Sequence, residues 1–526
     1  MTPARSVGQE PGRSSLRHLS VLIALVMIYV ATRVYALCLM PLYFDEEVHL
    51  TRAIEVWHGH PFWDISDGRI INQWAIAAFY PQNAPVFAAR IATVLVALPG
   101  FAAGYAVARR WFGRTAGLLA AGVWITCPYL FFYERTAMID AEAGALAVVA
   151  IWASLRLIQT GRRQDALLTG LALAIAMLFK FTAVPFVGSV GLIVLFLGKV
   201  PWRQRLENFA LIGLVILTCF TVPLLYAATH QGFSVVFGWL AGSGGRGLTW
   251  AWNLETLWAQ VVDYGTVIWS LFFGVGLLGI IVGHPPASFR SRGLRGRRDI
   301  YLLLSASALP LAVILVLVAF VMPRHFVVGV PILLTLAGGG LGILIDQVPR
   351  AAPRFGWLVP ALTSVATILL VLGIIPFARL AYTSPGALPL PPLERGQYLT
   401  GYSAGFGLRE AVLDFPRTVG PVGTPIVASM YPDGCRLANF YDTWGYHMRC
   451  VDAPGLEVIQ STLAAQPVNG TVYVLAEAQP IGLNPAWMMA LPQVKVTRVT
   501  GYARPGETAD TASVVLWQIE KISAHD

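Results

Sequence analysis

Residues 19–49 read LSVLIALVMIYVATRVYALCLMPLYFDEEVH, and this stretch decides the class of fold. Its first part, residues 19–42, is an apolar run long enough to cross a bilayer as a helix, which takes about 20 residues. Three adjacent carboxylates follow directly, Asp45, Glu46 and Glu47, and then His49. Like charges at a membrane boundary repel one another and lose hydration. They indicate either a functional site or a charged collar that marks the end of a helix.

The composition is that of a protein that crosses the bilayer many times. Of 526 residues, 56% are hydrophobic and only 12% are charged, and the mean hydropathy is +0.63. The first apolar run is too long for a signal-peptide core and lacks a clear cleavage site, so we expect it to remain as an anchor. The pattern predicts about eleven spans, near residues 19–42, 84–108, 116–133, 140–158, 166–180, 183–198, 207–228, 264–283, 300–321, 326–345 and 356–377.

Basic residues alternate between the gaps that separate these spans. They gather near residues 109–114, 156–163, 199–205, 290–298 and 350–354, whereas most acidic residues lie in the other gaps. The positive-inside rule therefore places the N-terminus in the cytoplasm, and an odd number of spans places the C-terminus outside. We expect the protein in the cytoplasmic membrane, with its basic patches at anionic lipids and not at nucleic acid.

The chain divides into four parts by composition. Residues 1–18 form a cytoplasmic tail, 19–379 the transmembrane domain, 380–396 a Pro-rich linker and 397–526 an α/β domain outside the membrane. In the last part, the patterns predict helices near 406–415 and 455–465, and strands near 424–430, 471–477 and 512–519. The predicted fold class is a polytopic α-helical membrane protein with an extracytoplasmic α/β domain.

Two cysteines and a glycine-rich turn distinguish the external part. Cys435 and Cys450 are its only cysteines, and an oxidising compartment permits a disulfide between them. Their spacing is not the CxxC spacing of a zinc site. Residues 401–407, GYSAGFG, precede a predicted helix and fit either a tight turn that caps it or a phosphate loop, of which the cap is the more common.

Ionisable residues of the membrane part collect in the gaps of the external face. Acids and bases that each end a helix on one face can converge on a single cavity, where carboxylates serve proton transfer and cations hold an anionic ligand. Arg33 is the main exception, because it lies within the first span, as an interfacial anchor or an internal partner for acids. The residues that collect there are Asp45, Glu46, His49, Glu134, Arg135, Asp140, Lys180, Arg246, Arg324 and His325.

Four local patterns in residues 20–340 resemble the GT-C membrane glycosyltransferases, in the group of the protein O-mannosyltransferases and the aminoarabinose transferases that modify lipid A. They are an Arg before an Asp-Glu pair, an Arg before an Asp, a Gly-rich stretch that ends in Lys, and a late Arg-His pair. The usual His-Pro-Pro of the first loop is missing, which leaves the acceptor open. The matching positions are Arg33 with Asp45 and Glu46, Arg135 with Asp140, Gly170 to Lys180, and Arg324 with His325.

This resemblance implies a polyprenyl-phosphate sugar as donor and a lipid, polysaccharide or protein as acceptor. The sequence has no Walker loop. Its two GxGxxG stretches, residues 242–247 in an external gap and 274–279 in a predicted span, do not lie between a strand and a helix, as a nucleotide site requires. On this hypothesis Asp45 is the general base, and Glu46 and Asp140 are further catalytic carboxylates. The donor phosphate is bound by cations and supported by neighbouring groups: Arg324, Lys180, Arg135, Arg246 and His325 bind it, and Arg33, Glu134 and His49 support them.

Several alternatives remain open from sequence. No cofactor is required, but a divalent metal could bind between Asp45, His49 and Asp140. Arg135 could instead form an ion pair with Asp140, and Lys180 could snorkel from a helix end. Direct displacement inverts the anomeric centre, whereas a second carboxylate acting as nucleophile retains it. The competing function is a transporter or flippase for a lipid-linked or small anionic solute, which should carry its charges near the centres of paired spans.

Overall fold

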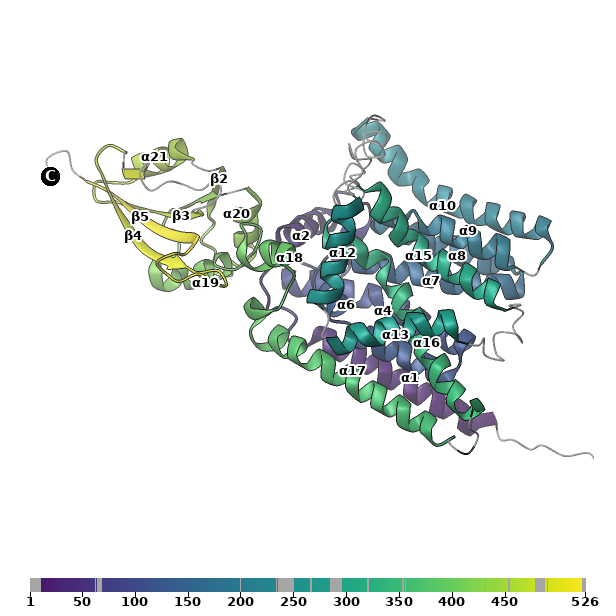
Figure 1. Cartoon of the computed structure of the whole chain (residues 1–526). Helices are drawn as coiled ribbons and strands as arrows, with labels where there is room; N and C mark the ends of the chain where they lie inside the picture. Colours follow the sequence, from purple (N-terminus) through teal and green to yellow (C-terminus); the bar gives the residue numbers. More distant parts are fainter. Residues whose placement is uncertain are drawn as a thin grey trace, which may run out of the picture.

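The protein consists of a helical bundle with a smaller α/β domain at one end of it (Figure 1). The computed structural model describes residues 11–61, 63, 69–198, 200–232, 234, 250–264, 267–283, 296–318, 321–351, 354, 356–430, 432–452, 455–477, 488–489 and 491–522.

The bundle is built from helices that follow the apolar runs of the sequence. Its long or medium-length helices are α1 (Pro11–Val34), α2 (Phe44–Trp57), α4 (Pro85–Phe112), α5 (Arg114–Thr126), α7 (Ile139–Thr160), α8 (Arg163–Phe179), α10 (Trp202–His230), α12 (Trp250–Asp263), α13 (Val267–Val282), α15 (Arg297–Leu317), α16 (Val330–Ala351) and α17 (Leu358–Thr383). Short elements join them: α3 (Asn72–Ala77), α6 (Pro128–Tyr133), η1 (Phe181–Ala183), α9 (Phe186–Leu192), η2 (Ile193–Leu197) and η3 (Pro323–Val328).

Six of the described helices are long and apolar enough to cross a membrane: α4, α7, α10, α15, Val330–Val348 of α16, and α17. The predicted number of about eleven spans is therefore not confirmed. Segment 116–133 is divided between α5 and α6, because Pro128 has no N–H to continue the first helix. The other four segments form shorter apolar helices: residues 19–34, α8, residues 181–197 and α13.

Glycines allow the centre of the bundle to pack closely. A Cβ atom added at Gly338 or Gly342 of α16 would lie within 2.5 Å of Ala120 or Ala116 of α5. On another side of α16, the backbone of Gly340 lies against the backbone of Gly276 in α13. Small residues that let backbones approach are the usual basis of helix packing in membranes, where no hydrophobic force drives helices together.

The C-terminal domain contains a mixed five-stranded sheet in the order β2-β1-β3-β5-β4. Strand β1 runs parallel to β2 and β3, and β5 runs antiparallel to β3 and β4. Strands β1, β3 and β5 lie where strands were predicted, whereas β2, β4 and α20 were not predicted. The elements after the bundle are η5 (Pro385–Ala387), α18 (Pro392–Arg395), η6 (Gly396–Thr400), α19 (Leu408–Thr418), β1 (Ile426–Met430), α20 (Pro432–Asn439), β2 (Arg449–Asp452), α21 (Leu456–Ala464), β3 (Thr471–Glu477), β4 (Val494–Tyr502) and β5 (Val514–Lys521).

The α/β domain and the bundle share a hydrophobic core. Helices α2, α18 and α20 lie where the two parts meet (Figure 1). Leu42, Phe44 and Leu50 from the region of α2 join one buried cluster with Met430 and Leu437 of the α/β domain. The backbone N–H of Phe44 also donates to the carbonyl of Ser403 at 3.2 Å. The start of α2 is therefore held by residues from both parts of the chain.

The glycine-rich turn before α19 is a helix cap. Gly407 has a φ of +82°, which favours glycine, and it directly precedes α19. Its backbone N–H donates to Glu410 Oε2 at 2.7 Å. A carboxylate of the chain thus occupies the position that a phosphate would take in a phosphate loop.

Candidate active site

Helix α2 begins with three carboxylates that point in different directions. Tyr43 precedes the helix, and its backbone N–H donates to Glu46 Oε2 at 2.9 Å. Acidic residues in the first turn are favoured by the positive end of the helix dipole. Successive residues of a helix are rotated by about 100°, so Asp45, Glu46 and Glu47 each meet a different partner.

Glu46 is fully buried and bonded through both of its oxygens. Arg90 of α4 donates from Nε to Oε1 and from Nη2 to Oε2, each at 2.9 Å. The backbone N–H of Ala137 donates to Oε1 at 2.7 Å. These contacts do not favour the predicted catalytic role, because a carboxylate with both oxygens engaged is not free to take up a proton. Glu46 instead joins α2 to α4 and to the segment before α7.

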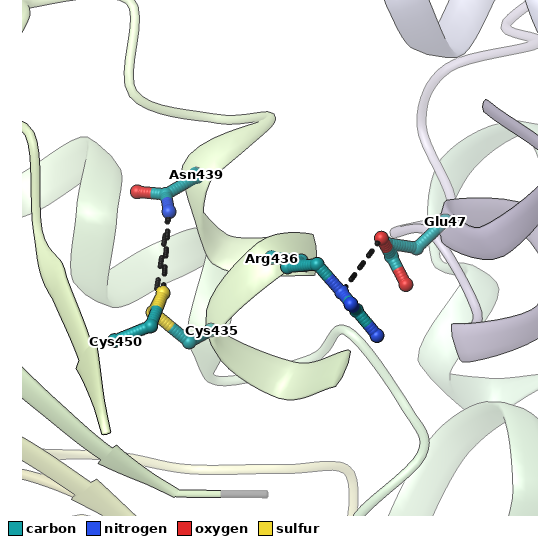
Figure 2. The surroundings of a disulfide bond; sticks show 5 residues. All are labelled: Glu47, Cys435, Arg436, Asn439 and Cys450. Carbon is teal, nitrogen blue, oxygen red and sulfur yellow. Dashed lines mark hydrogen bonds and ion pairs between the residues drawn. A yellow bond between two sulfur atoms is a disulfide. The ribbon is translucent and has the colours of Figure 1, made fainter. Parts of the chain in front are cut away.

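Glu47 connects α2 to the external domain (Figure 2). Its Oε1 atom lies 3.3 Å from Nε of Arg436 on α20 and accepts a hydrogen bond from Thr51 at 2.7 Å. Cys435, the neighbour of Arg436, is joined to Cys450 of β2 by a disulfide bond. The disulfide therefore ties β2 to the helix that contacts Glu47.

Asp45 is the partly exposed carboxylate of the three. Its Oδ2 atom lies 2.7 Å from Nη1 of Arg324 and 3.6 Å from Nη2 of Arg69. Arg324 also donates from Nη1 to the hydroxyl of Tyr43 at 3.2 Å. The carbonyl of Pro323 accepts a hydrogen bond from Tyr129, which ties η3 to α6. Asp45 is 21% exposed, so a ligand can reach it.

A second ion pair lies between Lys180 and Asp140. Helix α8 ends at Phe179, the backbone of Lys180 is extended, and Nζ of Lys180 lies 2.6 Å from Oδ1 of Asp140 at the start of α7. Asp140 is fully buried and Lys180 nearly so. Lys180 therefore does not snorkel, and Asp140 pairs with Lys180 and not with Arg135.

Two neutral histidines accompany these pairs. Burial lowers the pKa of His49 well below its ordinary value of 6.5, and Arg69, Arg52, Lys180 and Arg324 lower it further. Burial and the same kind of neighbours, Lys180, Arg324 and Arg69, likewise lower the pKa of His325. Nδ1 of His325 accepts a hydrogen bond from the backbone N–H of Met322 at 3.3 Å. At neutral pH, His325 can therefore offer a phosphate a hydrogen bond but no positive charge.

Arg135 and Arg33 hold the structure around the end of α1. The guanidinium of Arg135 donates to the carbonyls of Thr32, Arg33, Tyr35 and Ala36, at 2.7 to 3.2 Å. These contacts do not favour the predicted role of Arg135 in phosphate binding, because its donors are occupied by the last turn of α1. Arg33 is buried and pairs with Glu134 at 2.9 Å, as an internal partner and not an interfacial anchor.

The linker also contributes to the wall of this region. Glu394 of α18 is buried, and its Oε1 accepts hydrogen bonds from Tyr133 at 2.6 Å and from Tyr264 at 3.2 Å. The ring of Tyr398 in η6 packs on the ring of Tyr43, with centroids 4.5 Å apart. The end of the predicted linker thus lines this region, and Tyr398, just beyond it, reaches Tyr43, which contacts Arg324.

Sequence reasoning missed Arg69, Arg90, Glu394 and Tyr398. One signal was available for each arginine. Arg69 lies in the external first loop, where the positive-inside pattern predicts few basic residues, and Arg90 lies within the predicted span 84–108, where a charge is costly. Glu394 and Tyr398 lie in and beside a Pro-rich segment, where no pattern distinguishes a wall from a spacer.

Two further predictions concern a metal site and Arg246. Within the described residues, no group of three His, Cys, Asp or Glu side chains is placed to hold a metal ion, so Asp45, His49 and Asp140 do not form such a group. Arg246, the remaining predicted phosphate ligand, lies outside the described residues.

The chain resembles known proteins in part of its sequence and in its fold. Residues 69–226 match the family model described as dolichyl-phosphate-mannose-protein mannosyltransferase. No curated protein matches the chain. The structure of ArnT from Cupriavidus metallidurans bound to undecaprenyl phosphate has a TM-score of 0.61 and 14% identity, and covers 97% of this chain and 99% of that chain. The apo state of the same protein has a TM-score of 0.59 and 16% identity, with 96% and 98% covered.

At these identities, the likeness to the solved structures shows the fold, and it extends over both the bundle and the α/β domain. The family match lies inside the bundle and includes Arg69, Arg90, Asp140 and Lys180. The chain is thus a membrane protein with the GT-C glycosyltransferase fold. Its transmembrane part includes residues 69–226, which match the mannosyltransferase family model.

Proposed function

We propose that the protein transfers a sugar from a polyprenyl-phosphate donor to a hydroxyl group of an acceptor, on the extracytoplasmic face of the membrane. The observation that carries this proposal is the cluster of Asp45 with Arg324 and Arg69, together with the nearby pair of Asp140 and Lys180. Three cations stand against two carboxylates, which leaves a surplus of positive charge for an anionic ligand. A related fold, ArnT, binds undecaprenyl phosphate.

The donor phosphate would bind to Arg324 and its neighbours. A guanidinium offers a planar set of donors that fits two phosphate oxygens. Nε of Arg324 is buried and has no partner among the described residues, so Arg324 retains a donor for a ligand. As the phosphate becomes the leaving group, its charge grows, and fixed cations then stabilise the transition state more than the ground state.

Asp45 would act as the general base. It is held by Arg324 in the absence of a donor, and phosphate oxygens would compete for the same guanidinium. Release of Asp45 from this pair would leave a carboxylate beside the anomeric carbon, ready to take the proton of the acceptor hydroxyl. Such a base contributes roughly 10²–10⁴ in rate.

The transfer would then proceed in one displacement. The acceptor oxygen forms a bond to the anomeric carbon, the bond from that carbon to the phosphate oxygen breaks, and the hydroxyl proton moves to Asp45. The products are the glycosylated acceptor and polyprenyl phosphate, and the anomeric centre is inverted. Glu46, which is engaged by Arg90, would support the position of Asp45 and take no proton.

The proposal places both ion pairs outside the cytoplasm, in the cytoplasmic membrane. The positive-inside pattern supports this orientation. A lipid-linked donor fits a compartment without nucleotide sugars, since its tail stays in the bilayer while its phosphate reaches the surface. The acceptor is a lipid, a polysaccharide or a protein with an accessible hydroxyl.

A panel of donors tests the proposal. The purified protein in lipid nanodiscs is incubated with undecaprenyl phosphates that carry different hexoses or pentoses. A crude envelope fraction is added as the source of acceptor. We expect one glycosylated lipid to be converted to undecaprenyl phosphate, as followed by mass spectrometry. Conversion of nucleotide sugars alone, with every glycosylated lipid left intact, would contradict the proposal.

A further inference from the structure

Three side chains around the cations have buried polar atoms without partners. Among the described residues, no hydrogen bond reaches Nδ1 or Nε2 of His49, Oδ2 of Asp140, or the hydroxyl of Tyr398. His49 and Asp140 are fully buried and Tyr398 is 1% exposed. A buried polar atom without a partner destabilises the fold, and such atoms are rare in folded proteins. A ligand that supplies the missing partners would remove this cost.

These side chains come from separate elements and share the same cations. His49 lies one helical turn after Asp45 on α2, and Lys180 and Arg324 both act on its pKa. Asp140, on α7, is paired with Lys180 through its other oxygen. The ring of Tyr398, in η6, packs at a tilt against Tyr43, whose hydroxyl accepts a hydrogen bond from Arg324. The unpartnered atoms therefore belong to residues that neighbour the cations proposed for the phosphate.

The types of these atoms distinguish between ligands. Asp140 is paired with Lys180 through Oδ1, and its unpartnered Oδ2 can accept a hydrogen bond. Neutral His49 offers one donor and one acceptor. A phosphate diester has acceptors only, so it cannot satisfy Asp140 or the acceptor nitrogen of His49. Sugar hydroxyls both donate and accept. A polyhydroxylated group can therefore satisfy all of these atoms, whereas a phosphate alone cannot.

A metal ion is a weaker explanation for the same atoms. His49 and Asp140 could each offer a ligand atom, but the described residues hold no third ligand of the usual types near them. Arg69, Lys180 and Arg324 also lie near His49, and their positive charges would repel a divalent cation. A neutral, hydroxyl-rich group has no such conflict.

We propose that His49, Asp140 and Tyr398 form the subsite for the glycosyl group of the donor, next to the phosphate at Arg324. This assignment rests on the proposed function and goes further, because it separates the residues that hold the sugar from those that hold the phosphate. Arg324 should contribute to the binding of any polyprenyl phosphate. Tyr398 and His49 should contribute only when a sugar is attached.

Paired binding measurements test this subsite. Dissociation constants in nanodiscs are measured for undecaprenyl phosphate and for a panel of undecaprenyl phosphates that carry one hexose or pentose. The wild type should bind at least one glycosylated lipid more tightly than the bare lipid. Tyr398→Phe, which removes only the unpartnered hydroxyl, should reduce this preference by about fivefold to tenfold, the loss of one hydrogen bond of about 1–1.5 kcal/mol.

The bare lipid serves as the control for folding and for the phosphate site. Tyr398→Phe should bind it as the wild type does, whereas Arg324→Ala should lose affinity for bare and glycosylated lipids alike. Tyr446→Phe is a matched control, because it removes the hydroxyl of a buried tyrosine that is bonded to the carbonyl of Gly420, away from the proposed subsite. His49→Gln, which keeps an amide donor and acceptor in a different position, should lower the preference with less effect on the bare lipid.

The outcomes separate this inference from the proposed function. A wild type that binds bare and glycosylated lipids equally overturns the subsite, since water alone then satisfies the unpartnered atoms, but leaves the phosphate site standing. Full sugar preference in Tyr398→Phe, or an equal loss for both lipids, also overturns it. A wild type that binds no polyprenyl phosphate of any kind contradicts the proposed function itself.

Discussion

Nη1 of Arg324 lies 2.7 Å from Oδ2 of Asp45, so the cation proposed for the phosphate and the proposed base neutralise one another in the absence of a donor. This ion pair joins η3, which comes late in the sequence, to the first turn of α2. It also makes Arg324 a residue with two alternative partners, a carboxylate of the chain or a phosphate of the donor. The site is therefore prepared for an anion without leaving a buried cation unpaired.

Replacement of Arg324 tests the phosphate site. Arg324→Ala should weaken binding of undecaprenyl phosphate at least about tenfold, which corresponds to 1.4 kcal/mol, because a charged pair of hydrogen bonds is lost. Arg324→Lys should recover only part of the affinity, since an ammonium cannot match two oxygens in one plane. Native mass spectrometry with the lipid measures this. Arg417→Ala, an exposed change on α19, is the control, and equal affinity in Arg324→Ala and in this control would argue against the site.

The contact between Arg436 and Glu47 predicts that the external domain steadies the start of α2. Arg436→Ala should leave Glu47 without its ion-pair partner on α20 and should increase hydrogen exchange of the amides in residues 44–57. Arg436→Lys keeps the charge and should retain most of the protection. Arg498→Ala, on β4 away from α2, is the matched control. Unchanged exchange in Arg436→Ala would mean that the other contacts of α2 hold the helix without this ion pair.

Glu394 predicts a dependence of stability on pH. Burial raises the pKa of Glu394 from its ordinary value of 4.5 to about 8, although hydrogen bonds from Tyr133 and Tyr264 oppose this. Between these two values the folded state keeps a proton that the unfolded state releases. Stability should therefore fall as pH rises from about 5 to 8, and the effect should be absent below that window.

Thermal unfolding of Glu394→Gln checks this dependence. Glutamine still accepts hydrogen bonds from the two tyrosines but does not ionise, so the melting temperature of the variant should exceed that of the wild type increasingly as pH rises from 5 to 8. Glu457→Gln, an exposed change on α21, should follow the wild type at every pH. Parallel curves for wild type and Glu394→Gln would show that Glu394 is already ionised in the folded protein.

Sidedness can be tested with single cysteines. In a chain whose free cysteines, Cys38, Cys127 and Cys219, are replaced by alanine, Thr508→Cys should react with a membrane-impermeant thiol reagent on intact cells. Gln164→Cys, in the first turn of α8, should react only after lysis. Both positions are exposed, so access is limited by the membrane. The reverse labelling would place the site in the cytoplasm, where a lipid-linked donor is no longer required.

The sequence indicated where charged residues meet the membrane face, but not how they pair. Asp45, Arg324, Lys180 and Asp140 could be predicted as a group, because each ends an apolar segment on the same side. The partners of Glu46 and Arg135 could not be predicted, since they depend on how α1, α2 and α4 pack. Tyr398 joins the site only because residues after the bundle fold back onto Tyr43, and no local pattern encodes that return.

Interrupted helices explain part of the difference between the predicted spans and the six long apolar helices of the described residues. Hydropathy detects apolar residues but does not detect where a helix must end. Pro128 and the turn at Lys180 interrupt apolar stretches, and the second interruption places Lys180 beside Asp140. The break in the helix is thus part of the site.

The central claim, that Asp45 is the base for transfer from a polyprenyl-phosphate sugar, is tested most directly by the turnover of Asp45→Asn. Release of undecaprenyl phosphate from the preferred glycosylated lipid is measured in nanodiscs with acceptor present, beside Asp414→Asn, a change on α19 away from the site. Asparagine has the shape of aspartate but accepts no proton. We expect turnover to fall by roughly two orders of magnitude or more, with binding of the lipid retained. Turnover equal to that of the wild type in Asp45→Asn would contradict the account.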